Sequence, residues 1–87
     1  MNDLVVVTKA EYVRDHTLAL TFSDGLRADI NYSVWIEKFP FFEPLKNIEY
    51  FKTFSIDGWT VSWPNGADIA PETLHKIALQ QAQPQTI

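Results

Sequence analysis

Cysteine is absent from this sequence of 87 residues, and glycine occurs only three times. The absence of cysteine excludes a fold held together by disulfides and fits a cytoplasmic protein, which is the location we expect. Three glycines that stand far apart cannot build the glycine-rich loop that cradles phosphates in nucleotide-binding proteins. A predicted turn explains each of them instead.

Basic residues are few as well. Seven Lys and Arg stand against eleven Asp and Glu, the net charge is −4, and the basic residues do not cluster. Affinity for a nucleic acid comes largely from neutralising phosphates, so we expect this domain to make no direct contact with DNA or RNA. The same deficit disfavours binding to an anionic membrane surface.

Long hydrophobic runs are missing too. A membrane-spanning helix needs about 20 consecutive apolar residues, and no stretch of this sequence approaches that length. The N-terminus has no basic region before its short apolar run, as a signal peptide would have. We therefore expect no association with membranes.

Groups that perform catalysis or bind metals are sparse. The two histidines, His16 and His75, are far apart in the sequence, and no cluster of His, Cys, Asp and Glu has the spacing of metal ligands. No serine stands in a Gly-x-Ser-x-Gly motif. We therefore predict a non-enzymatic protein with no catalytic residue, no cofactor and no metal site.

Apolar and aromatic residues are plentiful, at 46% and 14% of the chain. This is enough for a folded core, and the length fits a single domain. We expect that domain to span residues 1–79, followed by a polar tail or linker at residues 80–87. The aromatic share is high for so small a chain, so some rings should lie near the surface, where self-association would cover them.

Alternating apolar residues predict a first β-hairpin, with strands at residues 18–22 and 26–30, and residues 4–13 predict a further strand. A three-residue loop that ends in Gly25 sets Phe22 opposite Leu26 and brings every apolar side chain of the hairpin to one face.

The pair Asp57-Gly58 predicts a second hairpin with a two-residue turn, in which Ile56 lies opposite Trp59. Two polar residues, Thr60 and Ser62, are then expected to point away from the core. The expected apolar face of this hairpin carries five residues: Phe54, Ile56, Trp59, Val61 and Trp63.

The helices predicted are short, except for the last. Two prolines interrupt residues 32–53, which favours two short helices, partly 3₁₀, with Ser33 and Asn47 as N-caps. Pro71 is suited to begin a C-terminal helix. The fold class is therefore α+β: a small antiparallel sheet of two hairpins packed with two short helices and a C-terminal helix.

Residues 63–71, Trp-Pro-Asn-Gly-Ala-Asp-Ile-Ala-Pro, form the most conspicuous motif. One interpretation is structural: Trp63 ends a strand, Asn65 and Gly66 form a tight turn, and a helix begins at Pro71. The other is functional: Asn65, Asp68 and the indole edge of Trp63 form a small recognition site.

A second candidate region is the aromatic stretch around Pro40, in which four large rings stand within eight residues. The rings could pack in the core, or they could form a partner or dimer surface, because interface cores favour aromatic residues. The rings are those of Trp35, Phe39, Phe41 and Phe42.

Several of these segments resemble a known family. The segments are Leu-Thr-Phe-Ser-Asp-Gly at residues 20–25, Phe-Glu-Pro-Leu at residues 42–45, Phe51, and above all residues 63–74. Over residues 6–79 the chain is similar to the family catalogued as domain of unknown function 2442. The resemblance implies a small bacterial α+β domain with no established activity. Relatives include proteins with a C-terminal helix-turn-helix and short proteins in a toxin–antitoxin-like setting.

Three hypotheses on function follow. The first is a non-enzymatic protein-interaction module that forms a homodimer or docks another protein. The second is the N-terminal sensory or dimerisation part of a bacterial transcriptional regulator whose helix-turn-helix is absent from this chain. The third, a small enzyme or ligand-binding domain, requires a cleft that groups Asn65, Asp68 and His75. The candidate interaction residues are Trp35, Phe39, Phe41, Phe42, Trp63, Asn65 and Asp68.

Overall fold

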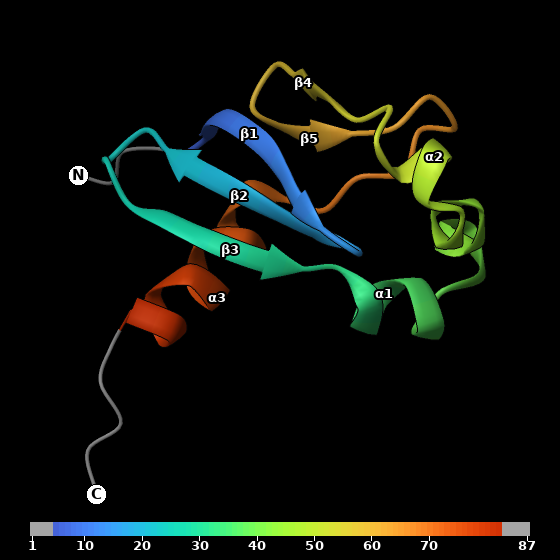
Figure 1. The fold of residues 1–87 in the computed structure, drawn as a ribbon. Helices are drawn as coiled ribbons and strands as arrows, with labels where there is room; N and C mark the ends of the chain where they lie inside the picture. Colours follow the sequence, from blue (N-terminus) through green and yellow to red (C-terminus); the bar gives the residue numbers. More distant parts are fainter. Residues whose placement is uncertain (1–4, 83–87) are drawn as a thin grey trace, which may run out of the picture.

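A computed structural model describes residues 5–82 of the chain and confirms the α+β class (Figure 1). The elements in chain order are β1 (Val7–Arg14), β2 (Thr17–Phe22), β3 (Arg27–Asn31), α1 (Ser33–Lys38), the 3₁₀ helix η1 (Pro40–Lys46), α2 (Ile48–Phe51), β4 (Ser55–Asp57), β5 (Thr60–Ser62) and α3 (Pro71–Ala82).

The strands form two antiparallel sheets rather than the single sheet expected. One sheet has the order β1-β2-β3, and the other consists of β4 and β5 alone. The second hairpin lies beside β1, where the Val7 N–H donates to the Trp59 carbonyl at 2.9 Å. β1 carries irregularities next to Val7 and Tyr12 in its pairing with β2, and such bulges bend a strand locally.

The first hairpin has the predicted register. Leu20 lies opposite Ala28 and Leu18 opposite Ile30, and the Phe22 N–H donates to Leu26 across the three-residue loop at 2.8 Å. The apolar face of β2 is fully buried. Figure 1 shows α3 lying against the three-stranded sheet, which explains why this face needed an apolar pattern.

The register predicted for the second hairpin is wrong by two residues, because Ile56 was expected opposite Trp59. Ile56 pairs with Val61, and Asp57 pairs with Thr60, so the two turn residues are Gly58 and Trp59. Gly58 has a φ of 77°, and the Trp59 N–H donates to the Asp57 carbonyl at 2.9 Å, as in a γ-turn centred on glycine.

All three residues of β5 are buried, so its polar and apolar sides face protein alike. The Thr60 hydroxyl donates to the Ile69 carbonyl at 2.7 Å, and Ser62 is buried as well. Trp59, expected in the core, is instead 61% exposed. The alternation of apolar and polar residues therefore could not predict this register, because neither face of β5 is in contact with water.

The predicted residues at the helix N-termini are confirmed for two of the three predicted helices. The Asn47 side chain accepts the backbone N–H groups of Glu49 and Tyr50, at 2.8 and 3.4 Å, and Pro71 is the first residue of α3. Ser33 is not a cap but the first residue of α1, and the side chain of Asn31 accepts its N–H at 2.8 Å. The helix α3 continues through Ala82, and the rest of the predicted tail lies outside the described residues.

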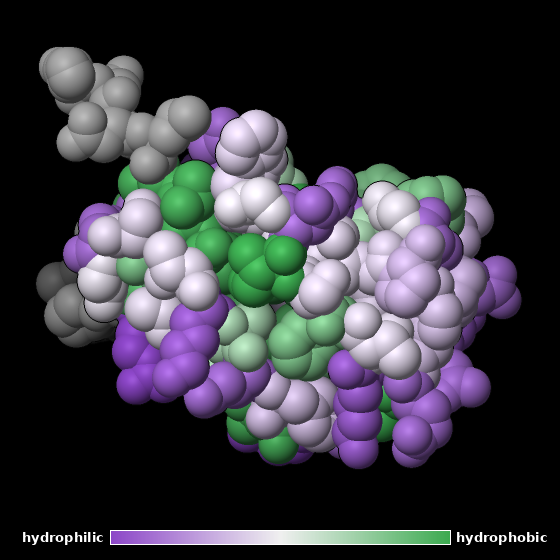
Figure 2. Space-filling view, turned by 90° about the horizontal axis from the view of Figure 1, so that it is seen from above, coloured by the Kyte–Doolittle hydropathy of each residue, from purple (hydrophilic) through white to green (hydrophobic). Residues whose placement is uncertain are grey.

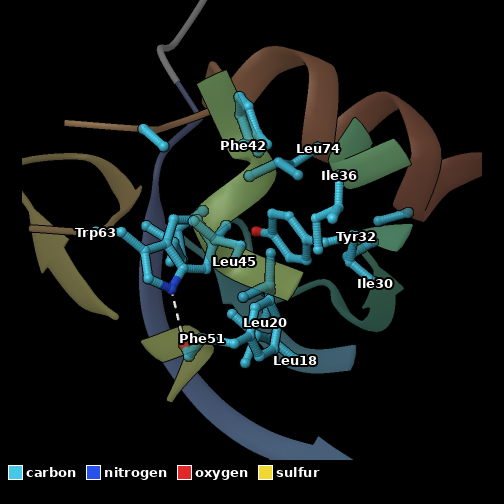
Figure 3. Packing of buried hydrophobic residues seen from close by; sticks show 14 of the residues in the cluster. Leu18, Leu20, Ile30, Tyr32, Ile36, Phe42, Leu45, Phe51, Trp63 and Leu74 are labelled. Atoms are coloured by element: carbon cyan, nitrogen blue, oxygen red, sulfur yellow. Dashed lines mark hydrogen bonds between the residues drawn. The ribbon is translucent and has the colours of Figure 1, made fainter. Parts of the chain in front are cut away.

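The core centres on three aromatic residues from distant parts of the chain (Figure 3). Tyr32 packs edge-on against Trp63 and Phe51, with ring centroids 5.3 and 5.9 Å apart, and Phe51 stacks on Trp63 at 5.5 Å. Each such pair adds roughly 0.5–1.5 kcal/mol beyond the burial of its area. The Trp63 indole N–H donates to the Phe51 carbonyl at 2.7 Å, which satisfies its buried polar atom.

Candidate functional site

The structure brings the two candidate regions of the sequence together. The Asn65 side-chain amide donates to the Phe41 carbonyl at 3.2 Å. The Phe41 ring lies so close to Gly66 that a Cβ there would touch it at 3.9 Å. We call this site the aromatic corner, and it consists of Phe39, Phe41 and Phe42 together with the turn at residues 64–66.

The turn at residues 64–66 is a three-residue loop with a glycine bulge. The Gly66 N–H donates to the Trp63 carbonyl at 2.8 Å, and the Trp63 N–H donates to the Ala67 carbonyl at 3.1 Å. Gly66 has a φ of 88°, a conformation that glycine adopts without a steric penalty. The Asn65 side-chain oxygen accepts the Ala67 N–H at 3.0 Å. Asn65 thus orders its own turn with its oxygen and holds η1 with its nitrogen.

Two rings of the aromatic corner face solvent. Phe41 is 58% and Phe39 47% exposed, whereas Phe42 between them is buried. The Phe42 ring centroid lies 6.4 Å from each of the other two. Phe42 therefore anchors η1 in the core, and the two exposed rings project from a backbone that Asn65 and the surrounding prolines hold in place.

The other predicted site residues do not join this surface. Trp35 is half-buried and packs edge-on against Tyr32 at 5.3 Å. Trp63 is buried, and its indole N–H is already used within the core. Asp68 is exposed and pairs with Ser62 through its backbone. The structure thus places Asn65, Asp68 and Trp63 in three different environments and does not bring them into one recognition site.

The two histidines each join two elements of the fold. His75 on α3 approaches Asp24 in the β2–β3 turn, with Nε2 2.8 Å from Oδ2, and packs edge-on against Phe22. His16 approaches the Lys46 carbonyl at 3.1 Å through Nε2. A carbonyl oxygen can only accept, so this nitrogen carries the hydrogen. The third hypothesis required His75 to lie with Asn65, but His75 lies with Asp24 and Phe22 instead.

The pKa of Asp24 lies below its usual value. The first cause is the Leu26 backbone N–H, which donates to the carboxylate at 3.0 Å, and the second is the contact with His75. Both partners favour the ionised form. The Asp24 side chain is 44% exposed, so solvent screens its contact with His75, which stabilises the attachment of α3 only modestly.

Within residues 5–82, Tyr32 is the one titratable side chain deep in the core, and burial raises the pKa of its phenol far above the usual range. Figure 3 shows its hydroxyl pointing toward Leu45 and Trp63. No side chain or carbonyl within residues 5–82 hydrogen bonds to it. Without access to solvent, this hydroxyl cannot exchange protons with a ligand at the surface. Within the same residues, no three His, Asp or Glu side chains lie close enough to hold a metal ion.

Apolar surface is not confined to the aromatic corner. Figure 2 looks down on the side of the molecule that carries the β4–β5 hairpin, and hydrophobic side chains gather in the middle of this face. Sequence reasoning missed Trp59, the most exposed of the large hydrophobic residues described. The Asp57-Gly58 pair favoured a turn at those two residues, so no local signal placed Trp59 in the turn.

The chain belongs to the family described as "Protein of unknown function (DUF2442)", whose family model matches residues 7–79. This confirms the resemblance noted in the sequence. Comparisons with curated proteins and with solved structures gave no match. No helix within residues 5–82 has the length and apolar character needed to cross a bilayer.

Proposed function

We propose that this family member is a non-enzymatic protein-interaction module of the cytoplasm that self-associates as a homodimer through the aromatic corner. The observation that carries the proposal is the exposure of Phe41 and Phe39, at 58% and 47%, on a backbone fixed by the Asn65 hydrogen bond. Exposed aromatic rings on a rigid backbone lose little entropy when a partner covers them, so the area they bury favours association.

Charges beside these rings suit a second copy of the same chain. Lys38 immediately precedes Phe39, Glu43 immediately follows Phe42, and both charged side chains are exposed. A two-fold interface brings the same patch of each subunit together in opposite directions, so residue i of one copy meets residue j of the other. Lys38 of one protomer can then lie near Glu43 of its partner, at the polar rim of an aromatic centre.

The non-enzymatic part of the proposal is supported by what the polar groups already do. Asn65 is occupied by its own turn and by Phe41. His75 and Asp24 pair with each other, and His16 holds the end of η1. Groups committed to holding the fold together are poorly placed to transfer protons to a substrate.

Sedimentation equilibrium over a dilution series tests the proposal. The wild type should dimerise, and Phe41→Ser should weaken the dimer by about 30-fold, as loss of a typical hot-spot residue of about 2 kcal/mol does. Leu79→Ser is the matched control, because Leu79 is also an exposed apolar residue, at 43%, but lies on α3. A wild type that stays monomeric at about 1 mM would overturn the proposal, since 1 mM corresponds to only about 4 kcal/mol.

A charge exchange tests the two-fold arrangement separately. Lys38→Glu and Glu43→Lys should each weaken the dimer, because each places like charges opposite one another. The double variant should restore most of the affinity. If the double variant is weaker than both single variants, Lys38 and Glu43 do not face each other across the interface.

A further inference from the structure

We propose that the depression beside Trp59 binds one basic side chain, of Lys or Arg, from a partner protein. The depression is lined by Val5, Val6, Trp59, Pro71 and Glu72 and has a volume of about 250 Å³. Pockets for drug-sized ligands and cofactors span roughly 300–1,000 Å³, so this space suits a single side chain rather than a cofactor.

Hydrogen bonds hold the backbone of Trp59 in place, whereas its ring is exposed. Its N–H donates to the Asp57 carbonyl and its carbonyl accepts the Val7 N–H, both at 2.9 Å. The side chain is nevertheless 61% exposed, and no hydrogen bond among residues 5–82 uses its indole. Trp35 and Trp63, by contrast, pack into or against the core. The indole of Trp59 therefore stands at the depression as an aromatic surface that a ligand can reach.

The charge of the lining decides the class of side chain that fits. Among residues 5–82, Glu72 is the one ionisable residue that lines the depression, and neither of the two charged contacts in this range involves it. An apolar occupant would remove this carboxylate from water without a partner, which is unfavourable. A basic occupant places its methylenes on Val5, Val6 and Pro71 and its charge between the indole and Glu72.

The helix α3 begins at the depression, and the positive end of its dipole disfavours a cation there. The N-terminal end of a helix carries about half a positive charge, whereas Glu72 in the first turn carries a full negative one. The sum favours a cation. The whole chain, with its net charge of −4, does so as well.

A pair of isosteric peptides tests the inference. Acetyl-Val-Arg-Val-amide is compared with acetyl-Val-citrulline-Val-amide, which has the same shape but no charge, in a titration followed by ¹H–¹⁵N NMR. The Arg peptide should shift the Trp59 indole N–H signal and bind at about 1–10 mM, as expected for one side chain. The citrulline peptide should bind at least about fivefold more weakly.

Variants separate this site from the aromatic corner. Glu72→Gln should reduce affinity for the Arg peptide to that of the citrulline peptide, whereas Glu49→Gln, which removes an exposed carboxylate from α2, should not. Phe41→Ser should leave the titration unchanged, so failure of the proposed dimer would not affect this result. Equal binding of the two peptides, or no shift of Trp59 at about 20 mM peptide, would overturn the inference.

Discussion

Two turns of this molecule, at residues 23–25 and 64–66, share one backbone geometry. In each, the residue before the turn donates its N–H to the residue after it, at 2.8 Å in the first and 3.1 Å in the second. Each third residue is a glycine, with φ of 92° and 88°. In each, the middle side chain, Asp24 or Asn65, accepts the backbone N–H two residues further on at 3.0 Å.

The turns differ in what the second atom of that middle side chain contacts. Asp24 reaches His75 on α3 with its other oxygen, at 2.8 Å. Asn65 reaches the Phe41 carbonyl on η1 with its amide nitrogen, at 3.2 Å. An imidazole N–H needs an acceptor, whereas a carbonyl needs a donor. The local turn tolerates either residue, so the distant partner explains which of the two stands at each position.

The largest expected effect is that of Asn65→Asp. The new carboxylate can still accept the Ala67 N–H, but it faces the Phe41 carbonyl with no hydrogen to donate. We expect a loss of about 1–3 kcal/mol in the free energy of unfolding, from a half-buried acceptor placed against another acceptor. At this chain length, each kcal/mol lowers Tm by roughly 4–8 °C, which a calorimetric melt at pH 7 resolves.

The reverse exchange, Asp24→Asn, is the control. It keeps the oxygen that accepts the Leu26 N–H but presents an NH2 group to His75 Nε2, on a side chain that is 44% exposed. Its loss should be below that of Asn65→Asp, because solvent screens a contact made by so exposed a side chain. Equal losses for the two exchanges would mean that the partner on η1 is no more important than the one on α3.

The first hairpin, which contains one of these turns, could be predicted from the sequence because one of its faces is buried and the other is not. Burial on one side makes the apolar pattern alternate, and a shift of one residue would place Leu18 and Leu20 in water. The loop length then follows from the pairing of Phe22 with Leu26. The Asn47 cap and the Pro71 helix start were predictable as well, because both depend on local geometry.

The second hairpin could not be predicted in this way. Both sides of β5 are buried, and its Thr60 is satisfied by Ile69, so a polar residue there says nothing about solvent. The sequence predicted which residues belong to the candidate site, but not that Asn65 and the aromatic stretch contact each other. The aromatic excess indicated exposed rings, but only the fold shows that Asn65 holds Phe41, because their hydrogen bond joins residues 24 positions apart.

A test of the shared backbone is to add one methyl group to each turn. Gly25→Ala and Gly66→Ala should each lower the free energy of unfolding by about 1–2 kcal/mol, because an L-residue pays that much in the left-handed conformation. A Cβ at position 25 meets nothing within 4 Å, and one at position 66 makes only an ordinary contact with Phe41 at 3.9 Å. The two losses should therefore agree in chemical denaturation. A clearly larger loss at Gly66 would show that the aromatic corner has less room than the structure indicates.

The smallest effect is a dependence on pH that distinguishes the two middle residues. The pKa of Asp24 is lowered in the folded protein, while an unfolded Asp titrates near 3.9. Its stabilisation is therefore present above that value and is lost as the pH falls through the folded pKa. The Tm difference between wild type and Asp24→Asn should close as the pH falls from about 5 to below the folded pKa, because the wild type loses stability.

The Tm difference between wild type and Asn65→Asp should also become smaller at low pH, but because the variant gains stability. Its new carboxylate faces a carbonyl, so the folded protein favours the protonated form, and the pKa of this group should be raised. Stability relative to wild type is then regained as the pH falls, because a protonated acid can donate to the Phe41 carbonyl. Melts of the three proteins across this pH range would separate a wild type that weakens from a variant that recovers. A difference between wild type and Asp24→Asn that stays constant with pH would mean that the charge of Asp24 contributes nothing to its turn.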